Sequence, residues 1–374
     1  MALPIKAFLP VRSAIKENFM VSRSDYVAQR TLPTENCQCG DILAEDIYNN
    51  YGSAITVKNT AINPFIKQKL ISMGISRVRV YDSSRETFKL KDMGSKKIAE
   101  DYKVYVSTFK EIVYELSIKG KLNFRKLNTI CDSLLSHIKE AGHAIRFLSK
   151  IKKYDDYTYN HSINVAFYSM LIAKWMKLPE DERRDVVLSG LLHDIGKTKI
   201  PIHILNKKAA LLSDEYDEMK KHSVYGYNIL KASGRVAGEV CRAVLLHHER
   251  EDGSGYPFGI RGTHINKFAK IIAITDVYDA MISNRVYKKA VCPFNAFEMF
   301  YTDGLKSFDI NILMTFTKNI SPYFISSKVF LNDGVLGEIV YIPPSDITKP
   351  VIRTGTGFID LSRDSDNKVI GMAN

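Results

Sequence analysis

The chain has few cysteines and no long apolar run. Its 374 residues include five cysteines, an odd and sparse set that argues against a disulfide framework and fits reduced thiols. No stretch approaches the ~18 consecutive apolar residues of a membrane helix, and the first residues lack the apolar segment and small-residue cleavage site of a secretory signal. We therefore expect a cytoplasmic protein with no membrane span.

Internal repeats, low-complexity tracts and a stripe of interleaved basic and aromatic residues are also missing. Such a stripe would be expected of a protein that binds single-stranded nucleic acid. An excess of positive charge is present, with 53 Lys+Arg against 41 Asp+Glu. This charge favours anionic ligands but does not choose between a phosphorylated small molecule and a nucleic-acid backbone. Direct binding of nucleic acid is not expected.

Four regions of the chain differ in hydrophobic pattern. Residues 1–100 predict a small α+β unit, with strands near 42–47, 54–57 and 77–81, a helix between Asn63-Pro64 and Gly74, and a polar linker at 82–97. Residues 101–152 predict connecting helices and residues 153–325 a helical bundle. Residues 326–374, with glycine and proline turns among Val/Ile pairs, predict a short β-rich tail. The fold class is therefore mainly α.

Candidate metal ligands lie between positions 161 and 276, most of them at the edge of an apolar helical stretch. A lone histidine of this kind is more often a satisfied, partly buried imidazole, but a carboxylate inside the apolar helix 271–276 needs a partner or a metal, because burying a bare charge costs several kcal/mol. The set contains no thiolate, unlike a structural zinc site, so a water-activating cluster fits better. Its members are His161, His193, Asp194, His222, His247, His248 and Asp276.

The adjacent pair His193-Asp194 closes the helix predicted over 183–193. Gly196 is expected to end that helix and to leave both side chains at its exposed end. Adjacent helical residues lie ~100° apart, so both can address one centre only if it lies between their faces. An oxygen of Asp194 could also touch a second centre.

Taken together, these segments resemble the HD-GYP family, a subgroup of the HD superfamily of metal-dependent phosphohydrolases. The resemblance covers residues 157–290, and Gly255-Tyr256-Pro257 is the element that separates this family from other HD enzymes. The matching segments are YTYNHSINVA around His161, HDIGK from His193, HSVYGYNIL from His222, HHEREDGSGYPFG from His247 and DVYDAMISNRVYKKA from Asp276.

The resemblance implies a helical HD-type domain that hydrolyses cyclic di-GMP to pGpG through a metal-bridged hydroxide, with onward hydrolysis to GMP left open. One metal would be held by His161, His193, Asp194 and Asp276. Asp194 would bridge to a second metal, held by His222, His247 and His248. Two cations sharing a hydroxide can stabilise both the attacking and the leaving oxygen of a phosphoryl group.

Metal number and identity also follow from the resemblance. Some family members carry a carboxylate one helical turn before the first histidine and hold a third metal, whereas this chain has Tyr157 there. We therefore expect two divalent ions. Imidazole and carboxylate ligands suit several metals, and the family favours iron or manganese.

Catalysis is assigned to Asp194 and to Lys197, whose ammonium would neutralise a phosphate oxygen. An arginine suits nucleotide recognition because its planar fork binds phosphate or guanine acceptors in pairs. The predicted substrate contacts are Lys197, Gly255, Tyr256, Pro257, Asp279, Arg285 and Lys288, the last two being implied by the resemblance.

Two other interpretations stay open at this point. An HD-type phosphohydrolase acting on another nucleotide would keep the metal ligands but would not need Gly255-Tyr256-Pro257 or Arg285. A catalytically weak cyclic di-GMP sensor would bind without turnover, and the complete ligand set argues against it. The N-terminal unit and the tail would regulate or assemble, and a homodimer through the N-terminal unit or the connecting helices is compatible with this organisation.

Overall fold

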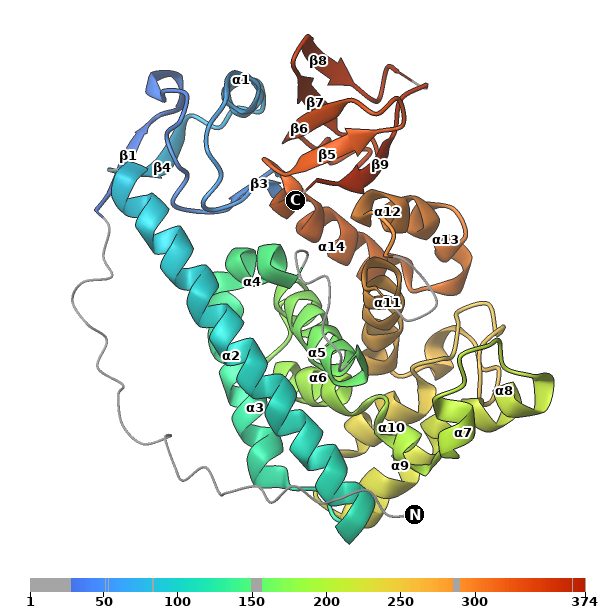
Figure 1. Ribbon diagram of the computed structural model, residues 1–374. Coiled ribbons are helices and arrows are strands. Elements are labelled where there is room, and N and C mark those ends of the chain that lie inside the picture. Colours follow the sequence, from blue (N-terminus) through green and yellow to red (C-terminus); the bar gives the residue numbers. More distant parts are fainter. Residues whose placement is uncertain are drawn as a thin grey trace.

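A helical bundle occupies the centre of the molecule, with two small β-containing units at one end (Figure 1). The computed structural model describes residues 28–50, 52, 54–82, 84–148, 157–284, 290–364 and 366–373. Within these residues, every helix is too short or too polar to cross a membrane. The mainly α fold with a small N-terminal α+β unit and a β-rich tail is confirmed.

The N-terminal unit combines two pairs of antiparallel strands with one helix. Strand β1 (Gln29–Pro33) pairs with β4 (Arg77–Tyr81), and β2 (Ile47–Tyr48) pairs with β3 (Ala54–Thr56). β1 was not predicted. In the segment 42–47, predicted as a strand, Ile42 and Leu43 form isolated bridges and Ile47 begins the short β2. The alternation of apolar residues there is real, but too few backbone groups find partners for a longer strand.

Helix α1 (Pro64–Ser72) begins and ends where the sequence predicts. The Asn63 side chain accepts a hydrogen bond from the backbone N–H of Ile66 at 2.8 Å, and Pro64 occupies the first turn. Gly74 adopts a φ of 73°, a left-handed conformation that glycine reaches without steric cost. Local capping chemistry therefore determines both ends of α1.

The C-terminal residues form a five-stranded sheet that lies beside α1 (Figure 1). The order is β8-β7-β6-β5-β9, which brings the last strand back to the first of the sheet. The Phe65 and Tyr341 rings lie 5.2 Å apart between the two units. The strands are β5 (Lys328–Leu331), β6 (Leu336–Tyr341), β7 (Val351–Thr354), β8 (Gly357–Asp360) and β9 (Val369–Met372).

One long helix, α2 (Ser84–Lys119), replaces the predicted linker. It begins soon after β4 and runs along α3 (Phe124–Ser136) and α4 (Ala141–Leu148) (Figure 1). The expected boundary at residue 100 therefore falls inside a helix. Gly94 favours a break in the sequence pattern, but one interior glycine costs only about 1 kcal/mol relative to alanine, and most of its neighbours are good helix formers.

The bundle is built around α5 (Tyr157–Trp175) and α11 (Lys267–Ile282). Both are apolar on nearly all sides, which is typical of helices surrounded by others, and the Ser169 and Thr275 hydroxyls hydrogen-bond between them at 2.8 Å. The other helices are α6 (Glu180–Leu192), η4 (Ile195–Lys199), α7 (Ile202–Leu205), α8 (Ser213–Lys220), α9 (His222–Ser233), α10 (Gly238–Leu246), α12 (Pro293–Tyr301), α13 (Gly304–Ser307) and α14 (Ile310–Ile320).

The helix predicted over 214–231 is in fact two helices, α8 and α9. α8 ends at Lys220, and α9 begins at His222. The break lets His222 follow the C-terminal end of one helix and start the next, a placement that a continuous helix would not give.

Candidate metal centre

All seven candidate ligands converge inside the bundle. Six of them are buried, and His248 is half-buried. Their ligand atoms fall into groups whose members lie within 4.8 Å of one another: His161 with His193 and Asp276, His222 with His247 and His248, and His193 with Asp194 and His247. The first group contains three of the four ligands predicted for one metal, without Asp194, and the second contains the three histidines predicted for the other. The third group combines Asp194 with a histidine from each predicted set.

Three of the histidines are oriented in the same way, by a helix end. Nδ1 of His193, His222 and His247 lies 2.8, 2.7 and 2.7 Å from the carbonyl oxygen three residues earlier. These carbonyls belong to the last turns of α6, α8 and α10, where no intrahelical partner exists. A carbonyl only accepts, so each Nδ1 carries the hydrogen, and each Nε2 is left for the centre.

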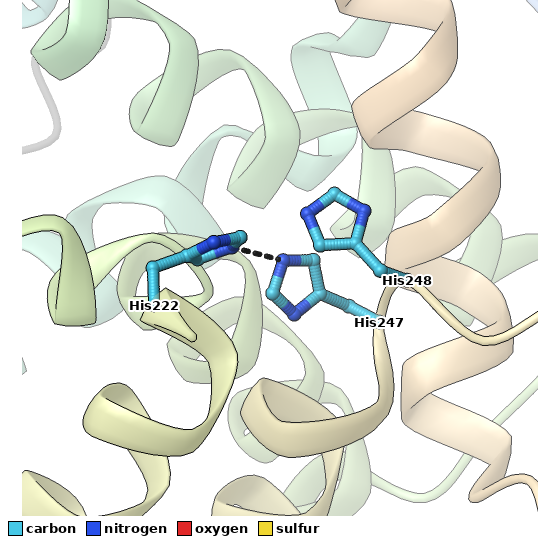
Figure 2. Close-up of side chains that lie close together, drawn as sticks. All are labelled: His222, His247 and His248. Carbon is cyan, nitrogen blue, oxygen red and sulfur yellow. Dashed lines mark hydrogen bonds between the residues drawn. The ribbon is translucent and has the colours of Figure 1, made fainter. Parts of the chain in front are cut away.

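The Nε2 atoms of His222 and His247 face each other at 3.3 Å (Figure 2). With Nδ1 protonated in both rings, both Nε2 atoms present lone pairs. Burial lowers the pKa of His222 and holds that of His247 well below its usual range, so a second proton on either ring is disfavoured. Two lone pairs this close need a shared cation.

Nε2 of His193 supports the same conclusion. It is buried and has no hydrogen-bond partner, although it lies 3.3 Å from Asp194 Oδ2. A buried polar atom without a partner is costly. The residues present therefore fit a metal ion that accepts these nitrogen lone pairs.

On the other side of the centre, His161 lies between carboxylates. Its Nε2 is 3.0 Å from Asp276 Oδ1, and its Nδ1 is 2.7 Å from Asp279 Oδ2. Burial alone would lower the pKa of His161, but the hydrogen bonds and charges of Asp276 and Asp279 outweigh it and raise the pKa to about 9. Metal binding here would displace a proton from His161.

Asp194 stands between the two groups. Its Oδ1 lies 3.4 Å from His222 Nε2, and its Oδ2 lies 2.5 Å from Lys197 Nζ. Burial acts to raise the pKa of Asp194, yet the Lys197 ammonium and the imidazoles of His193 and His222 hold it well below its usual range. The carboxylate is therefore ionised and can contact both groups.

The predicted exposure of the His193-Asp194 pair is wrong, because both residues are buried. α6 ends at Leu192, so the pair follows the helix. Gly196 does not cap α6; it allows η4 to pack against α9, since a Cβ there would overlap the backbone of His222 and Gly226. This close approach brings Asp194 next to His222.

The Gly255-Tyr256-Pro257 loop folds back over the histidine pair. A Cβ on Gly255 would overlap the backbone of His248 and Glu249, and the Tyr256 ring stacks on His248 with centroids 4.5 Å apart. The loop therefore supports a candidate ligand directly.

Sequence reasoning missed Glu249, which fixes this loop. The side chain is buried, and its two oxygens accept hydrogen bonds from the backbone N–H groups of Phe258 at 2.7 Å and Ile260 at 3.1 Å. A carboxylate directly after two histidines at the end of an apolar stretch was the available signal, since such a charge needs donors nearby if it is buried.

Asp279 lies beneath His161, away from any surface that a substrate could reach. Its side chain is 1% exposed, and its oxygens bind His161 Nδ1, Asn164 Nδ2 and Ser283 Oγ. This placement argues against the predicted substrate contact. Asp279 instead orients an imidazole, one helical turn after Asp276 on α11.

A pocket of about 230 Å³ opens onto the centre. Arg250, which was not predicted as a site residue, lines it; its Nη1 donates to the carbonyl oxygens of His247 and Glu249 at 3.2 and 2.9 Å. The other lining residues are Thr158, His161, Asp194, Lys197, His248, Asp276, Val277 and Ala280. Arg285, Lys288 and the Tyr157 side chain lie outside the described residues.

Comparison with known proteins agrees with this geometry. Residues 148–312 match the HD domain family. The chain is 35% identical over 213 residues to a cyclic di-GMP phosphodiesterase of Pseudomonas aeruginosa, covering 56% of this chain and 51% of that protein. It is 40% identical over 140 residues to a cyclic di-GMP phosphodiesterase response regulator of Xanthomonas campestris, covering 37% of each.

A 3'3'-cGAMP-specific phosphodiesterase of Vibrio cholerae is 38% identical over 133 residues, covering 35% of this chain and 30% of that protein. The chain thus spans about half the length, or less, of these relatives. An HD-GYP-type protein from Bdellovibrio bacteriovorus has the same fold, with a TM-score of 0.50 and 13% identity, covering 77% of this chain and 98% of that one. Residues 148–312 thus resemble HD domains, and the relatives of this region are named as phosphodiesterases of cyclic dinucleotides.

Proposed function

We propose that this chain is a metal-dependent phosphodiesterase that hydrolyses cyclic di-GMP to pGpG. The observation that carries the metal dependence is the pair of Nε2 lone pairs of His222 and His247, which face each other at 3.3 Å in a buried site. The substrate is supported by relatives that are named cyclic di-GMP phosphodiesterases. Whether a second hydrolysis gives GMP is a question for product analysis.

Two divalent ions would occupy the centre; imidazole and carboxylate ligands suit several metals, and the resemblance to HD-GYP proteins favours iron or manganese. His161, His193, Asp194 and Asp276 would hold one, and His222, His247 and His248 the other, with Asp194 shared. When bound, such ions lower the pKa of water and neutralise charge that develops on phosphoryl oxygens. Tyr157 replaces a carboxylate, so the metal content should plateau near two per chain.

The chain's own residues fix the geometry of this reaction. The carbonyls at the ends of α6, α8 and α10 hold three imidazoles with Nε2 toward the centre. The Lys197 ammonium lies beside Asp194, where it would pair with a non-bridging phosphate oxygen. Arg250 adds a second cation to the pocket wall. Substrate grip is assigned to the Gly255-Tyr256-Pro257 loop, Arg285 and Lys288.

The direct test is turnover by the full chain, purified without oxygen and loaded with Mn²⁺ or Fe²⁺. Cyclic di-GMP and 3'3'-cGAMP would be supplied separately, and products separated by chromatography. We expect conversion of cyclic di-GMP to pGpG and loss of activity on chelation. The named 3'3'-cGAMP-specific relatives make the second nucleotide the critical comparison.

Other results of this experiment would change the proposed function or reject it. Cleavage of 3'3'-cGAMP alone would replace the substrate and keep the chemistry. Binding of cyclic di-GMP without turnover in the metal-loaded chain would make it a sensor. Failure to bind any divalent ion would overturn the proposal as a whole. A cytoplasmic location and a homodimer stay predictions from the sequence.

A further inference from the structure

A series of buried hydrogen bonds, called the relay below, links α2 to the metal centre. The Tyr102 hydroxyl lies 2.8 Å from Asn164 Oδ1, and Asn164 Nδ2 lies 2.8 Å from Asp279 Oδ1. The other oxygen of Asp279 lies 2.7 Å from His161 Nδ1. We propose that Tyr102 is a positioning residue for His161 that acts through Asn164 and Asp279. The inference rests on the metal site proposed above, but not on the identity of the nucleotide.

The donor and the acceptor can be assigned for each hydrogen bond of the relay. Carboxylate oxygens accept, so Asp279 receives the Nδ1–H of His161 and an N–H of Asn164. The amide of Asn164 must therefore turn its oxygen toward Tyr102, whose O–H donates to it. His161 is left with Nε2 facing Asp276 and Asp194, the orientation that a metal ligand needs.

All of the linked side chains are withdrawn from solvent. Tyr102 is 4% exposed, Asn164 7% and Asp279 1%. In such surroundings a polar atom that loses its partner keeps the full cost of burial. Removing the tyrosine hydroxyl would leave the Asn164 oxygen without this donor and free the amide to turn. Ser283 Oγ also binds Asp279 Oδ1, at 3.0 Å, so the carboxylate would loosen without being released.

The relay begins on α2, the helix that follows the N-terminal unit. α2 begins at Ser84, shortly after Tyr81 ends β4 of the N-terminal unit, and it packs against α5, which carries His161 and Asn164 (Figure 1). The Tyr102 ring is held against Phe147 of α4, with centroids 5.4 Å apart. A displacement of α2 by the N-terminal unit would therefore reach His161 through hydrogen bonds as well as through packing.

The test is the Mn²⁺ affinity of the metal-free full chain, measured by isothermal titration calorimetry. Asp279→Asn should weaken binding by about 10- to 100-fold, since it alters the direct partner of a ligand histidine. Tyr102→Phe should weaken binding by about 2- to 10-fold, because one hydrogen bond further out is lost. In the Asp279→Asn background, Tyr102→Phe should have no further effect on Mn²⁺ affinity, because its route to His161 is already broken.

Tyr105→Phe is the matched control. Tyr105 is also buried on α2, but its hydroxyl bonds Ser133 and lies 3.0 Å from His137, on a path that does not lead to the centre. This variant should lower thermal stability about as much as Tyr102→Phe and leave Mn²⁺ affinity unchanged. If Tyr102→Phe does not fold, Asn164→Ala carries the same test.

Equal effects of the two tyrosine variants on Mn²⁺ affinity would overturn the relay, as would an undiminished effect of Tyr102→Phe beside Asp279→Asn. The measurement is independent of turnover. A wild-type chain that binds Mn²⁺ but does not cleave cyclic di-GMP would defeat the proposed function and leave the relay standing. A wild-type chain that binds no Mn²⁺ would defeat both.

Discussion

The two halves of the centre orient their histidines by different means. The carboxylate half contains His161, Asp276 and Asp279, and there an aspartate side chain holds the His161 imidazole, although His193, proposed for the same metal, is held by the Gly190 carbonyl. The imidazole half contains His222, His247 and His248, and there backbone carbonyls at the ends of α8 and α10 hold the first two rings. Both devices leave Nε2 toward the centre.

The difference has chemical consequences. The pKa of His161 is raised to about 9, because its carboxylate partners outweigh the effect of burial, whereas burial lowers the pKa of all three histidines in the imidazole half. A metal entering the carboxylate half must displace a proton, while the imidazole half already offers lone pairs. Substitutions can also remove the orienting group in the carboxylate half, but cannot remove a backbone carbonyl.

Asp194 joins the halves, so Asp194→Ala should have the largest effect. Without the shared carboxylate, two cations would lack the group that offsets their repulsion, and both should be lost. Turnover should then fall by more than about 10³-fold, since bound metal contributes several kcal/mol to the transition state. Metal analysis with product chromatography would measure this, with the exposed Asp214→Ala as control. Retention of two metals by Asp194→Ala would end the bridging assignment.

Substitutions in one half of the centre should remove the metal of that half alone. Asp276→Asn should remove the metal of the carboxylate half, and His222→Gln that of the imidazole half, each lowering the content from about two metals to about one. The reason is that each substitution leaves the other ligand group intact. Elemental analysis after dialysis would report the content. If either variant lost both metals, the halves would not be independent sites.

Lys197→Ala should slow turnover while both metals remain bound. Loss of one group that stabilises transition-state charge lowers kcat by about 10²–10³-fold and changes KM little. Lys199→Ala is the matched control, because Lys199 lies in the same short helix η4 and is exposed. A rise in KM with kcat unchanged would instead make Lys197 a binding residue.

Arg285→Ala should have the smallest effect, on recognition alone. Loss of a paired contact to guanine or phosphate should weaken cyclic di-GMP binding by about 1–3 kcal/mol, with metal content and kcat nearly unchanged. Arg363→Ala in the exposed tail serves as control. Unchanged KM in the Arg285 variant would remove this residue from the substrate site.

The sequence named a set of residues that the structure brings together, but it did not show the packing around them. Local signals were sufficient for α1, because Asn63, Pro64 and Gly74 act within one turn of the helix ends. Local signals failed at positions where tertiary packing determines the role of a residue. Gly94 suggested a linker, but the helix continues through it. Gly196 suggested a helix cap, but its role is to let η4 approach α9.

The orientation of the ligands could not be read from the sequence. The orientation of His222 depends on where α8 ends. The break at Lys221 lies inside a sequence pattern that fits one continuous helix. Asp279 was expected among the substrate contacts. Asp276 and Asp279 lie one helical turn apart on α11. The packing of α11 against α5 places Asp279 beneath His161, and the sequence does not show this packing.

Anomalous scattering from crystals of the manganese-loaded chain tests the central claim most directly. The account predicts two peaks about 3.5–4 Å apart, one in reach of His161 and Asp276, the other in reach of His222 and His247, with the Asp194 carboxylate between them. A single peak, a third tightly held metal near Tyr157, or two peaks that do not share Asp194 would contradict it.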